Sequence, residues 1–167
     1  FMNKNMLSPL GFAFNIKKLP EFNAFVQSCT LPGISIPNID RPTPFKKVPI
    51  YGDHIEYGEL ELSFKVNEDL GNYIEIFNWL TGIGFPKEFD QFAEIANGDR
   101  QIAGNGLYSD GYLMILSSNM QPLRRIDFED LFPVGLSDLA FDSQNSSVEY
   151  LEARVSFKFT NYTFTSV

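Results

Sequence analysis

The strongest constraint on the fold of this chain is a repeated alternation of apolar and polar residues. In ELELSFKV, residues 59–66, every second side chain is apolar. The pattern recurs in LEARVSFKFT, residues 151–160, and more briefly in GFAFNIKK, residues 11–18. Successive side chains of a strand point to opposite faces of a sheet, so each segment predicts a strand with one buried face.

Three weaker segments add further strands to this prediction. They are Phe22 to Cys29, Tyr108 to Leu116 and Arg124 to Phe128. Beyond Thr160 the apolar phase shifts, which predicts a bulge or a strand end at that point. The chain is therefore expected to be mainly β.

One segment has the period of a helix instead. Asn67 is a suitable N-cap, and the two acidic residues after it favour a first helical turn. Apolar residues then repeat at helical spacing up to Gly82, with Trp79 beside them. The repeating residues are Leu70, Tyr73, Ile74, Phe77 and Leu80. We expect this stripe to pack in the core, with the helix covering a sheet.

Two long segments have neither period. Residues 34–58, ISIPNIDRPTPFKKVPIYGDHIEYG, contain four prolines, which exclude a central strand but allow an extended arm or an irregular hairpin. Residues 86–106 are rich in Gly, Asn and Asp and are expected to form a long loop. Without a low-complexity linker or an internal repeat, residues 1–167 are expected to form a single domain.

Charge and composition exclude several classes of function. Residues 1–58 carry 6 Lys/Arg and 4 Asp/Glu, and residues 59–167 carry 7 and 17, so the net charges are +2 and −10. Such an acidic body repels nucleic acid. No apolar run approaches the ~18 residues of a membrane span, and the first residues lack a secretory signal, so neither membrane insertion nor export by that route is expected.

The residues that could carry chemistry do not form a recognisable site. The only histidine, His54, stands near Asp53 and Glu56 on a segment expected to be an exposed loop. The single cysteine, Cys29, excludes an internal disulfide and is expected to be a small buried apolar residue. No nucleophile turn or phosphate-binding glycine loop is present.

The stretch FEDLFPVGLSDLAFD, residues 128–142, places an apolar Leu-Phe-Pro-Val-Gly between acidic residues. With no partner base nearby, these acids are not expected to be catalytic. We therefore expect no catalytic residues, no metal ligands and no cofactor, so that the protein is not an enzyme. Leu131, Phe132 and Pro133 are expected to form an apolar anchor on a loop that enters a strand around Leu139 to Asp142.

The ordered set of these features resembles the tail tube proteins of contractile bacteriophages of the T-even type. The resemblance runs from about Gly11 to Tyr162, and Pro86 to Tyr108 depart from it. The matching segments are FAFNIKK, FVQSCTLPG, KKVPIYGD, ELELSFKVNED, LGNYIEIFNWLTG, LFPVGLSDLAFD and VEYLEARVSFKFTNY.

This resemblance implies an antiparallel β-sandwich or half-barrel with one flanking α-helix. It also implies homohexameric rings that stack into a hollow tube inside a contractile sheath and conduct DNA during ejection. The implied partners are further copies of the chain, the tail sheath protein, and baseplate and tail terminator proteins, with DNA passing without specific binding. The implied location is the virion tail, after assembly in the host cytoplasm.

Two sets of site residues follow from this implied assembly. Apolar residues of the arm and of the 131–133 anchor are expected to contact neighbouring subunits or rings. They are Phe45, Ile50, Tyr51, Ile55, Tyr57, Leu131, Phe132 and Pro133. Polar residues of the two clearest strands are expected to include lumen-facing side chains, which would make the wall acidic if much of the −10 lies there. They are Glu59, Glu61, Lys65, Glu152 and Lys158.

Other functions remain open from the sequence. A baseplate tube-initiating protein or a type VI-like tube protein would share this fold. A different class is a monomeric β-sandwich binding module in which the aromatic arm lines a ligand site.

Overall fold

Two antiparallel sheets that share one long strand form the body of the protein. The structure is a computed structural model that describes residues 5–84 and 105–167. The β8 sheet contains β1 (Phe12–Ile16), β8 (Ser109–Leu116), the first part of β9 (Pro122–Leu136) and β11 (Asn161–Ser166). The β7 sheet contains β2 (Val26–Thr30), β7 (Leu60–Lys65), β10 (Glu152–Lys158) and the last part of β9.

This architecture confirms the prediction of a mainly β, antiparallel fold with a flanking helix. The strands predicted at 59–66, 151–160 and 108–116 are present with nearly the expected bounds. The expected break near Thr160 is a strand end, because β10 stops at Lys158 and β11 begins at Asn161.

Strand β9 passes from one sheet to the other through a bulge. Its register against β8 shifts between Ser109 and Gly111, and Asp130 has a φ of 55°. Aspartate tolerates this left-handed conformation better than most residues. The Thr160 hydroxyl donates to Asp130 Oδ2 over 3.2 Å, and the Thr160 amide donates to the Glu129 carbonyl over 3.0 Å. The bulge bends β9, so one strand serves two sheets.

The bend corrects two expectations. Residues 131–133 lie inside β9 and not on a loop, and residues 139–142 form no strand. Pro133 is tolerated there because the β9–β10 register is also irregular, with Pro133 opposite Phe157 beside a second shift.

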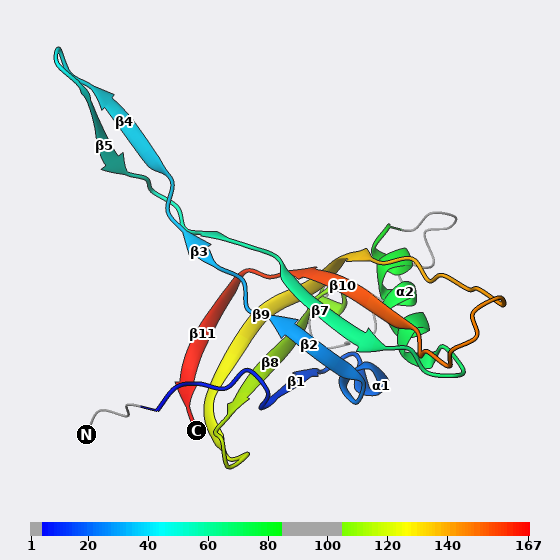
Figure 1. Cartoon of the computed structure of the whole chain (residues 1–167). Helices are drawn as coiled ribbons and strands as arrows, with labels where there is room; N and C mark the ends of the chain where they lie inside the picture. Colours follow the sequence, from blue (N-terminus) through cyan, green and yellow to red (C-terminus); the bar gives the residue numbers. More distant parts are fainter. Residues whose placement is uncertain (1–4, 85–104) are drawn as a thin grey trace.

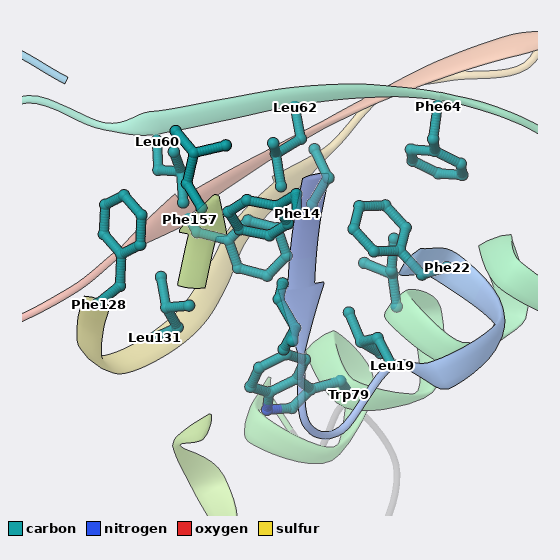
Figure 2. Packing of buried hydrophobic residues seen from close by; sticks show 14 of the residues in the cluster. Phe14, Leu19, Phe22, Leu60, Leu62, Phe64, Trp79, Phe128, Leu131 and Phe157 are labelled. Carbon is teal, nitrogen blue, oxygen red and sulfur yellow. The ribbon is translucent and has the colours of Figure 1, made fainter. Parts of the chain in front are cut away.

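The core lies between the two sheets and is rich in aromatic rings (Figure 2). Phe22 contacts Phe64 edge to face, with ring centroids 4.9 Å apart. Phe157 lies 6.5 Å from Phe22 and 6.0 Å from Trp79, so the three rings join β10, α1 (Pro20–Asn23) and α2 (Gly71–Gly84). Such ring pairs add to the stabilisation that area burial alone gives.

Helix α2 begins later than predicted and buries a different face. A turn places Leu70 at a φ of 61°, and the helix starts at Gly71, whose amide donates to Asp69 Oδ1 over 3.1 Å. The fully buried Asn72 causes this arrangement, because its side chain accepts from the Asn67 amide (3.1 Å) and donates to the Lys65 carbonyl (2.7 Å). The core face is therefore Asn72, Ile76 and Trp79.

Two members of the predicted helix stripe are exposed as a result. Ile74 is 44% exposed and Phe77 is 51% exposed, so the expectation that they pack in the core is wrong. Tyr73 and Leu80 pack partly against the core from its edge. The strand predicted from Phe22 is also wrong at its start, because Pro20 begins the short helix α1 and β2 starts only at Val26.

Residues 34–58 leave the body as a long hairpin (Figure 1). Its near part pairs β3 (Ile34–Ser35) with β6 (Glu56–Tyr57), and its far part pairs β4 (Asn38–Pro42) with β5 (Lys47–Tyr51). A short 3-10 helix, η1 (Asn105–Leu107), precedes β8. Most of the loop expected at 86–106 lies outside the described residues.

The β9 bulge gives a test of the fold. A β-branched residue fits a φ of 55° poorly, so Asp130→Val should lower the free energy of unfolding by about 1–3 kcal/mol. Asp130→Asn, which tolerates the same conformation, should stay within about 1 kcal/mol of the wild type. Urea unfolding followed by circular dichroism measures both, and equal loss in the two variants would contradict the role of the backbone conformation.

Candidate functional site

Aromatic contacts anchor the arm at its root. The Tyr57 hydroxyl donates to Asn161 Oδ1 over 2.6 Å, and the Tyr162 hydroxyl donates to the Pro32 carbonyl over 3.2 Å. The Tyr57 ring lies 5.4 Å from the Phe159 ring and 5.3 Å from the Tyr162 ring. Tyr57, expected to touch a neighbouring subunit, thus packs against its own body and fixes the direction in which the arm leaves.

Beyond this root the arm presents large apolar side chains to solvent. Phe45 is 97% exposed and Tyr51 is 84% exposed, and Ile50 and Ile55 are also exposed. Every residue of β4 and β5 is exposed, and among the residues that the structure describes each strand pairs only with the other. An isolated two-stranded hairpin with apolar residues in water is marginally stable, so a contact that covers these residues would stabilise it.

A tight turn holds the tip of the arm. The Thr43 amide donates to the Lys46 carbonyl over 3.0 Å, and the Lys46 amide donates to Thr43 Oγ1 over 3.1 Å. Pro44 occupies the second position of this turn, where its fixed φ is favourable. The turn places Phe45 at the end of the arm, directly before Lys46 and Lys47.

The five residues predicted to face a lumen lie on the outward face of the β7 sheet. Lys65 Nζ lies 3.2 Å from Glu152 Oε2, and Lys158 Nζ lies 4.0 Å from Glu59 Oε1, across the β7–β10 pair. Glu61 and Arg154 occupy the same face between these two pairs. The face thus carries three acids and three bases, and the −10 of residues 59–167 arises elsewhere.

The Lys65–Glu152 contact favours the ionised carboxylate. A hydrogen bond from Lys65 lowers the pKa of Glu152 below its usual value. A lowered carboxylate pKa contributes stability above the unfolded pKa, and this contribution disappears as the pH falls through the folded value. Because both side chains are more than a third exposed, the contribution is at most about 1 kcal/mol.

The apolar anchor at residues 131–133 belongs mainly to the core of its own subunit. Leu131 is fully buried in that core and Pro133 is buried, so the expectation that these two contact a neighbouring subunit is wrong. Phe132 is half-buried, and its ring meets Tyr108 edge to face at 5.8 Å. The bend of β9 turns the side chain of Leu131 inward, which the sequence did not indicate.

Two of the acids in residues 127–142, Asp127 and Asp130, have structural partners. Asp127 accepts from Arg125 Nε over 2.6 Å and from the Thr165 hydroxyl over 3.2 Å, and Asp130 belongs to the bulge. Among residues 5–84 and 105–167, no group of three or more His, Cys, Asp or Glu side chains could hold a metal ion. In the same residues no helix combines the length and apolar character that a membrane crossing requires.

Sequence reasoning missed a groove at the end of the β7 sheet away from the arm. The groove has a volume of about 810 Å³, and Phe25, Leu70, Phe141 and Tyr150 supply apolar parts of its lining. Phe141 is 75% exposed and Tyr150 is 78% exposed. The apolar residues in LAFD and VEYL gave a signal for this surface, but their segments lack a period that would indicate a strand or a helix.

Comparison with known proteins identifies the fold. No protein-family model and no curated protein matches the sequence. The structure is similar to a chain of the sheath-tube complex of the PVC extracellular contractile injection system in its extended state. That likeness has a TM-score of 0.65 and 14% identity, and covers 98% of this chain and 94% of the other. The chain has the fold of contractile injection system tube proteins.

Two other solved structures extend this likeness. A chain of the tube-terminating cap of the anti-feeding prophage matches with a TM-score of 0.62 and 12% identity, covering 100% of this chain and 95% of that one. Hcp1 from Flavobacterium johnsoniae matches with a TM-score of 0.53 and 10% identity, covering 94% and 96%. At such low identity the shared property is the fold, which extends over nearly the whole of each chain.

The reactivity of Cys29 tests whether its thiol in β2 is buried. Burial raises the pKa of the Cys29 thiol to about 12, so little thiolate exists at pH 8. Labelling by a thiol-specific disulfide reagent should be on the order of 10³-fold slower in native than in urea-unfolded protein. A Cys29→Ser/Phe164→Cys variant, with its cysteine at an exposed site on β11, should label rapidly when native. Native Cys29 labelling at the unfolded rate would contradict this burial.

Proposed function

We propose that this chain is the inner tube subunit of a contractile injection apparatus, in the form of the tail tube of a contractile-tailed phage. The observation that carries the proposal is the arm: a hairpin fixed at its root, held clear of the body, with its large apolar side chains exposed. A monomer gains nothing from such a surface, whereas a polymer buries it between copies.

Ring formation follows from the open edges of the sheets. Among the described residues, strand β2 pairs only with β7, and the last part of β9 pairs only with β10, so the β7 sheet has an unpaired side at each of its two edges. Exposed edges promote aggregation unless another strand covers them. In a homohexameric ring, the β7 sheets of neighbouring copies would join edge to edge into one closed barrel, which removes those edges.

The outward face of the β7 sheet would then form the wall of the lumen. Its residues Glu59, Glu61, Lys65, Glu152 and Lys158, with Arg154, balance in charge. Two of its three cations, Lys65 and Lys158, are paired with carboxylates, and the charges of the wall sum to zero, so it offers little free positive charge to phosphate and DNA would pass without specific binding. The role is mechanical and involves no chemical step.

The proposed partners are those of a tube inside a sheath. Further copies stack along the axis, a sheath protein surrounds them, and baseplate and terminator proteins cap the two ends. The solved structures that the chain resembles come from a sheath-tube complex and a tube-terminating cap, which supports this set. We place the assembled tube in the virion tail, after assembly in the host cytoplasm.

A second candidate is a tube of an extracellular injection system that carries no genome. The likeness to a chain of the PVC complex favours it. Nucleic acid content of particles purified with their sheath distinguishes the two candidates, because only the phage tail delivers DNA from an attached head.

Electron microscopy of purified protein tests the tube proposal. The wild type should form hollow tubes or six-membered rings, and concentration-independent monomers would contradict the proposal.

Replacing residues 38–51 by Asn-Gly should leave the circular dichroism spectrum of the body nearly unchanged, because Pro37 and Gly52 already lie together. This variant should form rings but no tubes, because it lacks the exposed arm.

The matched control for the shortened arm is Met120→Asn. Met120 is an exposed apolar residue away from the arm with a φ of 58°, which asparagine tolerates. It should form tubes like the wild type. Normal tubes from the shortened variant would refute the role of the arm and leave the ring proposal standing.

A further inference from the structure

We propose that the arm tip of one copy inserts into the groove at the far end of the β7 sheet of the next copy, with Phe45 as its anchor. This inference rests on the proposed tube function and names the contact that stacks one ring on another. The occupant of the groove is a second copy of this chain.

The groove has the shape and lining to receive an aromatic side chain. Its volume of about 810 Å³ lies within the range of sites that bind small molecules. Phe25, Leu70, Phe141 and Tyr150 line it, and the exposed rings of Phe141 and Tyr150 lose contact with water if it is filled. Phe45, 97% exposed on its turn, gains the most from such burial.

The charges of tip and groove are complementary. Glu68 and Glu149 line the groove, and neither forms an ion pair within the described residues. The lysine of the groove, Lys65, is already paired with Glu152. Lys46 and Lys47 follow Phe45 directly, and they too form no ion pair within the described residues. Two free cations thus meet two free carboxylates around an apolar contact.

The balance of charge supports the same pairing over a longer range. The far part of the arm, residues 38–51, contains Asp40 against Arg41, Lys46 and Lys47, a net charge of +2. The whole chain has a net charge of −8. A basic arm on an acidic body is attracted to other copies and guided to their acidic surfaces.

The position of the groove makes the contact head to tail. Strand β7 begins at Leu60, next to the arm, and ends at Lys65, in the groove lining. Its six residues span about 20 Å, so the arm, which extends away from the body, does not reach its own groove (Figure 1). A contact between two different surfaces builds an open stack along one axis when the rotation between copies does not close a ring.

Crosslinking between introduced cysteines tests the contact directly. In a Cys29→Ser background, Pro44→Cys places a thiol beside Phe45, and Val148→Cys places one beside Glu149 without removing a groove residue. Treating assembled protein with a short bismaleimide should give a ladder of dimers, trimers and longer species on denaturing gels. The pair Pro44→Cys/Phe164→Cys, with its second thiol on β11, should not give this ladder.

The outcomes separate this inference from the tube function. A ladder from the first pair alone supports the groove contact. Tubes in the microscope without a ladder overturn the groove contact and leave the tube function standing. Failure of the wild type to form rings or tubes overturns both.

Charge reversal gives an independent test with its own rescue. Lys46→Glu/Lys47→Glu in the tip, or Glu68→Lys/Glu149→Lys in the groove, should each reduce sedimented tubes about tenfold or more and leave rings. Combining all four substitutions should restore tubes, because the two charges are exchanged. Asp110→Lys/Asp138→Lys makes the same charge change outside the groove and should behave like the wild type. Tubes from both reversed variants, or no rescue by the combination, would overturn the contact.

Discussion

One apolar layer between the β8 and β7 sheets holds this protein together, and the bend of β9 makes that layer possible. Strand β9 pairs with β8 and β11 in its first part and with β10 in its last part. With Asp130 in a left-handed conformation, the strand turns inward and Leu131 joins the core. Strand β9 therefore forms backbone hydrogen bonds within both sheets, and the two sheets pack on the same aromatic side chains.

The packing of the core determines which surfaces of the protein stay exposed and available for contacts with other molecules. Helix α2 turns Asn72, Ile76 and Trp79 inward, and α1 adds Phe22. The outward face of the β7 sheet carries acids and bases in cross-strand contact, so it is exposed without a large excess of either charge. Two exposed apolar surfaces lie at opposite ends of that sheet, one on the arm and one around the groove. The two ends of the subunit along β7 therefore differ, with the arm at one end and the groove at the other.

A rigid tube requires both closure around a ring and continuity along an axis. In the proposed tube, the open edges of the β7 sheet provide for closure, because β2 and the last part of β9 each lack a partner on one side within the described residues. In the same proposal, the projecting arm and the distant groove provide for continuity, because a contact between unlike surfaces extends without limit when the rotation between copies does not close a ring. The likeness to tube proteins at identities of 10–14% shows that very different sequences reach this fold.

The sequence by itself determined the strands at 59–66 and 151–160, the presence of one helix and the irregular character of the proline-bearing arm. These depend on local sterics and on side-chain period, which a short stretch of residues sets alone. Only the tertiary structure decided which face α2 buries, because the amide of Asn72 bridges two residues of the preceding segment and rotates the helix. It also placed Leu131 in the core and brought Phe25, Phe141 and Tyr150 together in one groove. Contacts between segments so far apart depend on register and on a single bulge, and no local period encodes them.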